Sequence, residues 1–330
     1  MESKRIDWLA IVRGLNILLV VMFHVQLVDM TTGENHLFCE QITSIFTPLR
    51  IPLFIFISGG LLYLSRIKKE WDVLPLYRDK FQRIMLPFFF FVTVYFFIKV
   101  VMRPLVKTQA VLSVGSYFES FVKFQNHPSA PLWFLATLMT LMMMYPLFRK
   151  LCQKDIYMYL FFVFSCVFYY IDFSAYEEYN YFYLLSLNNY LVYFFFGIYF
   201  FRFKIYRHLD NFWVFLIFTG SYLLLYTFEV SLATSLCGIL MMVSLCMLLA
   251  RRMPKLFSSF REYIFQVYLM SLIFQAFVEL VLWKRVFYNE NFFLFFYLLN
   301  VLAGIYIPVL ISKAVEQCPI RMIRLCFGLK

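Results

Sequence analysis

The stretch that decides the fold is residues 8–28, WLAIVRGLNILLVVMFHVQLV, in which apolar residues surround Arg13 and His24. An apolar run of about 20 residues is long enough to cross a bilayer as a helix. A helix turns by about 100° and rises 1.5 Å per residue, so the two side chains share one face, about 16 Å apart along the axis. Because an ionisable group inside a bilayer is costly unless it meets water, a partner or a ligand, this register predicts a polar path into the membrane.

The composition of the whole chain predicts an integral membrane protein. Of its 330 residues, 63% are hydrophobic and 15% are charged, which is too apolar for a water-soluble domain. Ten continuous apolar runs occur, at 8–29, 42–65, 84–102, 132–148, 156–173, 186–201, 212–229, 232–250, 262–283 and 292–312. Continuous runs predict helices, since membrane strands would alternate. We expect an all-α, polytopic helical bundle with about ten transmembrane helices, forming a single domain over residues 1–330 with no appended soluble domain.

The net charge of +11 is distributed asymmetrically around these runs. Most basic residues fall in alternate connections, of which 66–83 is the most basic, and near the two ends, as at Lys4 and Arg5. The opposite connections hold Arg103, Lys107, Lys123, Lys284 and Arg285. By the positive-inside rule both termini are cytoplasmic, which agrees with an even number of spans. The charge thus reflects topology in a lipid bilayer, and we expect no nucleic-acid partner. The seven scattered cysteines predict neither a disulfide framework nor a metal site.

His24 and Arg13 are the first candidates for chemistry. A buried neutral imidazole can accept a proton as a general base, whereas the structural alternative for His24 is a hydrogen bond to a neighbouring helix. The Arg13 guanidinium either reaches the cytoplasmic interface along its flexible stem or offers its fork of donors to a phosphate presented from the cytoplasm. The shared helical face favours the functional interpretation of both residues.

The second apolar run contains a further charge between two prolines. Residues 46–60 read FTPLRIPLFIFISGG, so Arg50 lies between Pro48 and Pro52. Proline removes a backbone donor and frees a carbonyl group, and a loosened helix that carries a charge predicts a lined cavity. Arg50 is therefore a candidate contact for an acceptor or an oxyanion. Ser58, which precedes two glycines, either contacts a ligand or permits close helix packing.

Basic and aromatic residues mark the starts of two other runs. Lys80 and Arg83 lie at the cytoplasmic mouth of the third run, where they either bind a phosphorylated donor or reflect the positive-inside rule alone. Trp133, in the sequence Leu-Trp-Phe-Leu at 132–135, is either an acceptor contact or an aromatic anchor at the outer interface.

In this order the motifs resemble the acyltransferase-3 family of integral membrane proteins, which move acyl groups from cytoplasmic acyl-CoA to glycans and other acceptors. Arg13-x10-His24 is similar to the family's Arg/Lys-x10-His signature, whose histidine is regarded as catalytic. The other matching stretches are Arg50-Ile-Pro-Leu-Phe-Ile-Phe-Ile-Ser-Gly59, Lys80-Phe-Gln-Arg83-Ile-Met-Leu-Pro87, Leu132-Trp133-Phe134-Leu135 and Phe195-Phe196-Gly197. Two positions depart from the pattern, since Ala10 replaces a frequent acidic residue and Ser271 replaces a late histidine.

The resemblance implies a membrane O-acetyltransferase. The aromatic, low-alanine composition indicates a prokaryote, so we expect the chain in a prokaryotic plasma membrane. Acetyl-CoA would be the acyl-donor substrate, a hydroxyl of a cell-surface polysaccharide or lipid-linked glycan precursor the acceptor, and no bound cofactor is expected. The implied catalytic residues are His24 and Arg13, the donor-binding residues Arg13, Lys80 and Arg83, and the acceptor or oxyanion contacts Arg50, Ser58 and Trp133. His24 would act as a general base or carry the acyl group transiently. The alternatives are a transporter or flippase for a lipid-linked sugar and a non-catalytic partner of a polysaccharide synthase, and no particular oligomeric state is predicted.

Overall fold

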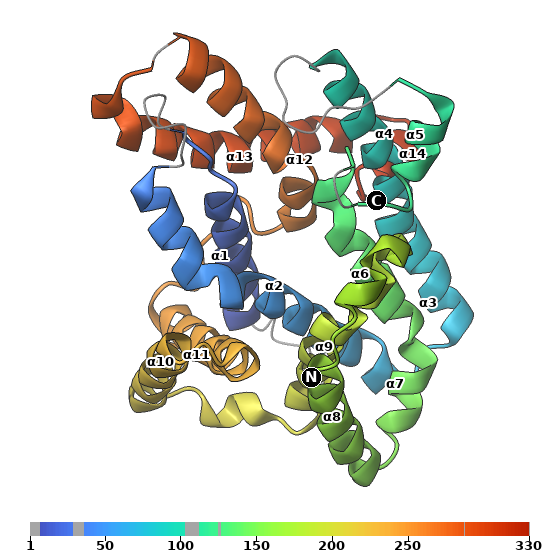
Figure 1. The fold of residues 1–330 in the computed structure, drawn as a ribbon. Helices are drawn as coiled ribbons and strands as arrows, with labels where there is room; N and C mark the ends of the chain where they lie inside the picture. The colour runs from blue at the N-terminus through green and yellow to red at the C-terminus, as the bar shows by residue number, and fades with distance from the viewer. Residues whose placement is uncertain (1–6, 29–35, 103–111, 125–126, 287, 330) are drawn as a thin grey trace. The chain divides into compact units, whose positions relative to one another are not determined.

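The computed structural model in Figure 1 describes residues 7–28, 36–102, 112–124, 127–286 and 288–329. Every regular element among these residues is a helix. The all-α class predicted from the apolar runs is therefore confirmed for the described part of the chain. Five charges used to assign the topology, at Lys4, Arg5, Arg103, Lys107 and Lys330, lie outside the described residues.

A helix covers most of each predicted apolar run. The α-helices are α1 (Asp7–Phe23), α2 (Leu37–Ser65), α3 (Val73–Lys80), α4 (Leu86–Val101), α5 (Val114–Glu119), α6 (Trp133–Met143), α7 (Tyr145–Leu151), α8 (Asp155–Tyr169), α9 (Leu187–Arg202), α10 (Phe212–Thr227), α11 (Ser231–Arg252), α12 (Ile264–Phe277), α13 (Phe293–Glu316) and α14 (Arg321–Cys326). Two π-helical turns, η2 (Phe81–Met85) and η7 (Val278–Val286), follow α3 and α12. The 3-10 helices are η1 (Ile67–Lys69), η3 (Ala130–Leu132), η4 (Ser174–Tyr179), η5 (Tyr181–Ser186), η6 (Ile205–His208) and η8 (Glu290–Phe292).

Several of these helices are long and apolar enough to cross a membrane. Within the described ranges six qualify, or seven if the bent pair Ala130–Met143 and Tyr145–Leu151 forms one span. The six are Leu37–Lys69, Val73–Val101, Tyr181–Arg202, Ser231–Arg252, Ile264–Val286 and Phe293–Glu316. Helices α1, α8 and α10 contain only 17, 15 and 16 residues, fewer than the roughly 20 that span a hydrocarbon core. The chain is thus a multi-pass membrane protein, whereas ten spans and cytoplasmic termini stay predictions.

The chain divides into two compact units, and α2 contributes to both of them. Unit 1 comprises Met1–Phe54 and Lys204–Ala314, and unit 2 comprises Ile55–Phe203 and Val315–Lys330. The boundary in α2 follows the segment that contains both prolines. A single domain over residues 1–330 stays a prediction.

Unit 1 is built around α1, which packs against α11 and α12, while α10 and α11 lie side by side (Figure 1). Its core contains fully buried side chains such as Ile17, Val21 and Val267. At Gly304 helix α13 approaches its neighbours closely, because an added Cβ would lie 2.9 Å from the side chain of Gln275 and 3.0 Å from that of Val21. The end of α1 is consequently enclosed by α12 and α13.

Unit 2 contains a close helix crossing between the second part of α2 and α9. A Cβ added at Gly59 would collide with the carbonyl oxygen of Phe194, and one added at Gly197 would collide with that of Phe56. Such contact between small residues is typical of membrane helix packing. The glycines that follow Ser58 thus serve packing, which was the structural alternative for this motif.

Candidate active site

His24 follows the last residue of α1, where the chain leaves the helix. Its Nδ1 lies 2.7 Å from the carbonyl oxygen of Val20, one turn earlier in the same helix. A carbonyl oxygen only accepts hydrogen bonds, so this contact places the ring proton on Nδ1. In the neutral ring the lone pair then belongs to Nε2, as a general base requires. The sequence-based expectation that the helix continues to residue 29 is wrong, because α1 ends at Phe23.

Arg50 and His24 both contact the aromatic ring of Phe23. The Cζ atom of its guanidinium is 2.9 Å from the centroid of the Phe23 ring. The Phe23 ring in turn contacts the imidazole of His24 edge to face, with centroids 5.2 Å apart at 84°. A cation over an aromatic face is held by the ring quadrupole. The structure therefore brings together two of the residues that the sequence identified, His24 and Arg50.

The backbone of α2 around Arg50 is held by polar side chains from three other helices of unit 1. In the amide orientation that satisfies both of its groups, Asn16 of α1 donates to the Arg50 carbonyl, 3.0 Å away, and accepts from the Phe54 N–H, 3.1 Å away. Ser235 of α11 donates to the Pro48 carbonyl at 2.6 Å, the group that Pro52 leaves without its helical partner. Tyr222 of α10 donates to the Ile45 carbonyl. This loosened segment is thereby fixed in one position.

The chain on either side of His24 is anchored by α12 and η7. The Gln275 side chain donates to the Val21 carbonyl at 2.9 Å, and Trp283 Nε1 donates to the Val28 carbonyl at 2.9 Å. Asn300 of α13 donates to the Gln275 carbonyl at 3.3 Å. π-helical turns such as η7 occur frequently at functional sites. The sequence analysis did not identify these residues as part of the site. The signal that could have identified them is that each is a polar side chain within an apolar run.

Arg13 lies inside α1, half-buried, and the structure does not bring its position next to that of His24. Eleven residues of helical rise separate the two positions by about 16 Å along the axis. The neighbouring Gly14 is packed against the Phe257 side chain, which leaves no room for a Cβ. A polar path shared by Arg13 and His24 stays a prediction.

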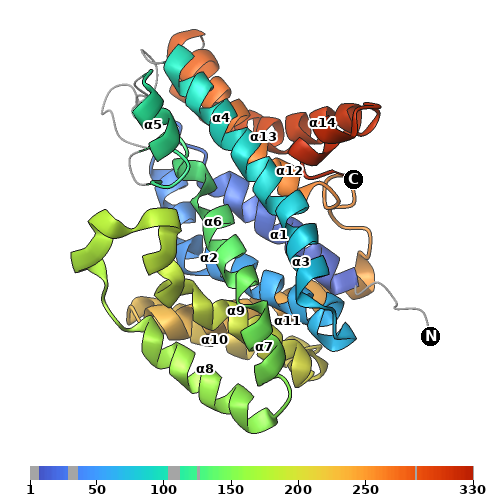
Figure 2. The same cartoon turned by 90° about the vertical axis from the view of Figure 1, so that its right-hand side faces the viewer.

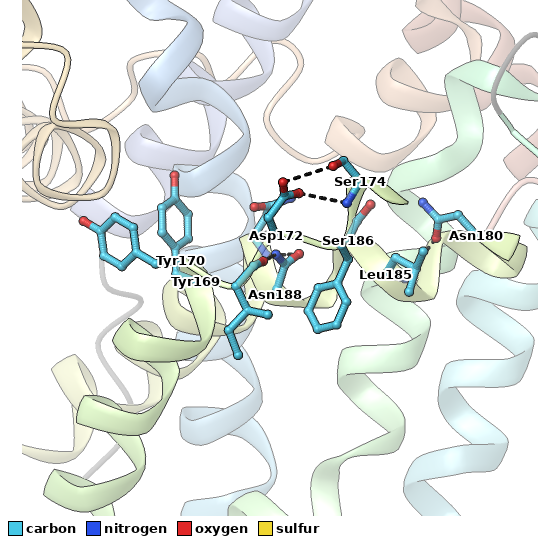
Figure 3. Close-up of a pocket in the computed structure, with 11 residues that line it drawn as sticks. Tyr169, Tyr170, Asp172, Ser174, Asn180, Leu185, Ser186 and Asn188 are labelled. Carbon is cyan, nitrogen blue, oxygen red and sulfur yellow. Dashed lines mark hydrogen bonds between the residues drawn. The ribbon is translucent and has the colours of Figure 1, made fainter. Parts of the chain in front are cut away.

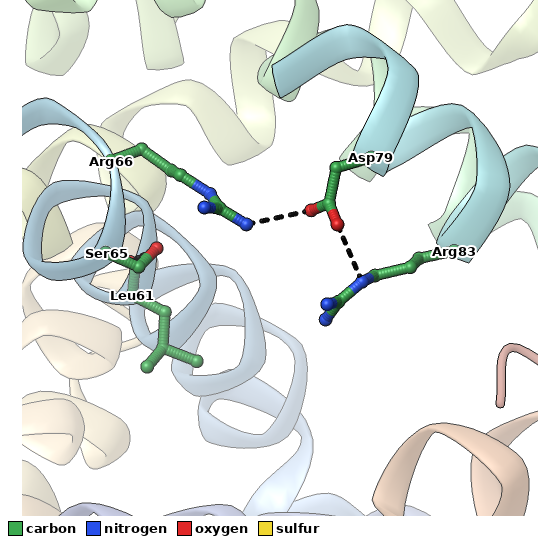
Figure 4. Close-up of polar contacts among 5 residues, drawn as sticks. All are labelled: Leu61, Ser65, Arg66, Asp79 and Arg83. Carbon is green, nitrogen blue, oxygen red and sulfur yellow. Dashed lines mark hydrogen bonds and ion pairs between the residues drawn. The ribbon is translucent and has the colours of Figure 1, made fainter. Parts of the chain in front are cut away.

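A second set of charges, in unit 2, surrounds the carboxylate of Asp79. Arg66 donates to its Oδ2 and Arg83 to its Oδ1, each at 2.9 Å, so one carboxylate orients two guanidinium groups (Figure 4). Lys80 is close enough for its charge to interact with all three. We call Arg66, Lys80 and Arg83 the cationic cluster. Three cations around one anion leave an excess of positive charge, which suits a phosphate-bearing ligand.

The cationic cluster is held against α7 through Trp71. The Cζ atom of Arg66 lies 3.4 Å from the centroid of the Trp71 ring. The Trp71 carbonyl accepts hydrogen bonds from Tyr145 at 2.5 Å and from Arg149 at 3.3 Å. Arg66 and Asp79 were missed as site residues. The four-residue spacing of Asp79 and Arg83 in a helix predicts their ion pair. The spacing between Arg66 and Asp79 predicts no such contact.

The remaining predicted contacts also belong to unit 2. Ser58 is half-buried in α2, beside the crossing with α9. Trp133 opens α6 and stacks obliquely on two tyrosines, with ring centroids 5.0 Å from Tyr183 and 5.4 Å from Tyr190. Ser271, which replaces the family histidine, is buried in α12 of unit 1. Arg13, His24 and Arg50 therefore lie in unit 1. The other predicted contacts, Ser58, Lys80, Arg83 and Trp133, lie in unit 2.

The sequence model of a family described as an acyltransferase domain matches residues 6–313, nearly the whole chain. No curated protein and no solved structure matches the chain. Within the described residues, no group of three or more His, Cys, Asp or Glu side chains is placed to hold a metal ion.

Proposed function

The chain belongs to the acyltransferase-3 family, and from this premise we propose that it transfers acetyl from cytoplasmic acetyl-CoA to a hydroxyl of a cell-surface polysaccharide or lipid-linked glycan precursor. Membership and the apolar helices make it a membrane acyltransferase. The observation that carries the proposal is the bond from His24 Nδ1 to the Val20 carbonyl. It supports a fixed tautomer in which Nε2 is the basic nitrogen.

In the proposed reaction His24 is the general base. Its Nε2 takes the proton of the acceptor hydroxyl while the hydroxyl oxygen attacks the carbonyl carbon of the thioester. A C–O bond forms, the C–S bond to CoA breaks, and the leaving thiolate takes up the proton from His24. The products are an acetyl ester and CoA with a free thiol. A positioned base of this kind contributes about 10² to 10⁴ in rate.

Arg50 is the proposed stabiliser of the negative charge that develops on the thioester carbonyl oxygen. Its guanidinium is held over Phe23 and its backbone is bonded to Asn16, so the group is oriented before the substrate arrives. Pre-oriented donors cost no reorganisation during the reaction, which makes them effective in a dry site. Arg13 is the proposed further contact to the donor.

The cationic cluster is the proposed site for the phosphates of CoA. Arg66 and Arg83 present guanidinium forks that match phosphate oxygens, and Lys80 adds a compact charge. Asp79 fixes both arginines through separate oxygens. We extend the predicted donor site, Lys80 and Arg83, by Arg66 on this geometry.

The test uses purified protein with acetyl-CoA labelled in the acetyl group. Wild-type protein should release free CoA thiol and transfer label to glycan in membranes, whereas His24→Ala should lose both activities and still insert. The matched control is His208→Ala, because His208 is an exposed histidine in η6. Full activity of His24→Ala would overturn the catalytic assignment. Label that remains on the wild-type chain without acceptor would show an acyl-histidine route instead of general-base catalysis.

A further inference from the structure

The connection between α8 and α9 lies at the end of these helices remote from the cationic cluster. The two helices pack side by side in unit 2 (Figure 2). At their other end Asp155, which opens α8, pairs with Arg202, which closes α9, at 3.1 Å. Arg149, at the end of the preceding helix α7, contacts the Trp71 carbonyl beside the cluster. Because α8 and α9 are 15 and 16 residues long, their connection is displaced by about 22–24 Å from that end.

A polar cavity of about 400 Å³ opens in this connection (Figure 3). A volume of this size is typical of small-ligand sites. The side chains that line it combine aromatic rings with hydroxyl, amide and carboxylate groups, and they include Tyr169, Tyr170, Asp172, Ser174, Asn180 and Asn189. The lining therefore offers flat apolar faces together with hydrogen-bond donors and acceptors.

A second cavity, of about 430 Å³, adjoins the first at Asn180, which lines both of them. Its other lining side chains are mostly aromatic and carry charges of both signs: Lys123, Phe124, Glu178, Tyr179, Tyr181 and Tyr183. Two concavities that share a wall form an elongated site, which suits a chain-like ligand more than a compact one.

The walls of the first cavity are held in place by hydrogen bonds of their own. Asn188, 6% exposed, donates to the Ile171 carbonyl at 2.7 Å and accepts from the Asn189 N–H at 2.8 Å. Asp172 accepts from the backbone and hydroxyl of Ser174 at 2.8 and 3.0 Å (Figure 3). These two bonds hold the pKa of Asp172 below its usual value. Its carboxylate therefore stays an acceptor for hydroxyl groups at neutral pH.

The second cavity is continuous with the aromatic residues around Trp133. Tyr183 lines the cavity and also stacks obliquely on Trp133, with ring centroids 5.0 Å apart. The Phe182 N–H donates to the Val122 carbonyl at 2.8 Å, which joins the connection to the segment before α6. Trp133 was one of three residues that the sequence analysis named as acceptor or oxyanion contacts, with an aromatic anchor as its alternative role. Its contact with the cavity lining links that assignment to a concave surface.

We propose that the two cavities on either side of Asn180 are adjoining subsites for a saccharide chain, with tyrosine rings facing the C–H faces of the sugars and Asp172, Asn180 and Asn189 binding their hydroxyls. The proposal deepens the proposed function and rests on it for the identity of the ligand as the acceptor. Tyrosines at a membrane interface also occur as belt residues that face lipid headgroups. A belt requires neither a cavity nor a lining of amide and carboxylate groups, and the structure contains both.

The test measures saccharide binding separately from donor chemistry. Purified protein is applied to an array of hexameric glucans, mannans, galactans, rhamnans and chitin oligosaccharides. Tyr170→Ala probes the first cavity and Tyr179→Ala the second, because these side chains are 66% and 68% exposed and their truncation leaves no hole in the core. Tyr176→Ala is the matched control, since Tyr176 is 58% exposed in the same connection and lines neither cavity.

We expect wild-type protein to bind at least one of these oligosaccharides, and both cavity variants to bind it about tenfold more weakly, a loss of about 1.4 kcal/mol. Tyr176→Ala should bind it as wild type does and should release CoA thiol at the wild-type rate. Absence of binding to every oligosaccharide overturns the proposal. So does equal binding by the cavity variants, or weaker association with lipid vesicles as their sole defect. If binding behaves as expected but wild-type protein never consumes acetyl-CoA, the proposed function fails while the saccharide site stands.

Discussion

Asp79 and Arg83, one helical turn apart where α3 passes into η2, form an ion pair in which the carboxylate's second oxygen is bonded to Arg66. The Arg83 side chain is 42% exposed and that of Arg66 only 14%. The Asp79 carboxylate thus orients the partly exposed guanidinium of Arg83 and the nearly buried guanidinium of Arg66. A phosphate that enters the cluster meets donors whose directions are already set.

The first prediction concerns Asp79→Asn. The amide oxygen can accept one hydrogen bond, and the amide nitrogen faces the second arginine as a donor, so one guanidinium loses its orientation. We expect the KM for acetyl-CoA to rise by about three- to tenfold, with kcat changed less than about twofold, since a partly exposed pair contributes little more than 1 kcal/mol. Initial rates of thiol release across a range of acetyl-CoA concentrations measure both constants. A lower KM would show that net positive charge outweighs orientation and would contradict the role given to Asp79.

The second prediction concerns Trp283→Phe, which keeps an aromatic ring but removes the donor to the Val28 carbonyl. The segment after His24 then loses an anchor. We expect kcat to fall by about tenfold with little change in the KM for acetyl-CoA, because a small misplacement of a catalytic group is costly in rate. The control is Trp213→Phe, since Trp213 is 69% exposed on α10. A rise in KM with unchanged kcat would place Trp283 in donor binding instead.

The third prediction concerns Asn16→Leu, a change that keeps the branched shape of the side chain at a residue that is 1% exposed. It removes the amide that bridges the Arg50 carbonyl and the Phe54 N–H. We expect a loss of about 0.6–2 kcal/mol in unfolding free energy, the range for polar contacts between membrane helices. Activity should fall further than the folded fraction, because the same contact orients Arg50. Unfolding in detergent measures the folded fraction, and thiol release on the same samples measures the activity. An equal fall in both would show that Asn16 stabilises the fold and does not orient Arg50.

The fold class and part of the site follow from local properties of the sequence. Run length and continuity decide between helix and strand, and a charge inside such a run, as at Arg13 or Arg50, is a functional signal by itself. The contacts of Asn16, Gln275 and Trp283 are different in kind. Each is made to a backbone carbonyl of a segment distant in the chain, and the sequence does not show which carbonyl group a side chain will reach. Pairs of this type require the packing of the helices to be known.

Span length shows a second limit of prediction from sequence. The apolar run at 8–29 continues past α1 because Val25, Leu27 and Val28 are buried in the unit 1 core without being helical. Apolar residues are favoured both in a protein core and in a lipid bilayer. Hydropathy therefore does not distinguish a buried irregular segment from the continuation of a membrane helix. The chain leaves the helix at His24, the candidate base. Hydropathy alone places this residue inside the helix.

The fourth prediction separates helix propensity from helix contact at two glycines. Ala is favoured over Gly in a helix interior by about 1 kcal/mol. At Gly220 of α10 an added Cβ meets nothing within 4 Å, so Gly220→Ala should stabilise the protein or leave it unchanged. At Gly197 of α9 the added Cβ collides with the Phe56 carbonyl oxygen, which belongs to the backbone and cannot move aside without shifting α2.

Gly197→Ala should therefore destabilise the protein despite its gain in propensity, by about 1–3 kcal/mol, as is typical of overpacking. Thermal unfolding of both variants in the same detergent compares them directly. The direction of the difference between the two variants is the decisive quantity, because the propensity gain is common to both and cancels. Equal melting temperatures would show that α2 and α9 can separate at no cost, and the close crossing at Gly59 and Gly197 would then not be required for the stability of unit 2.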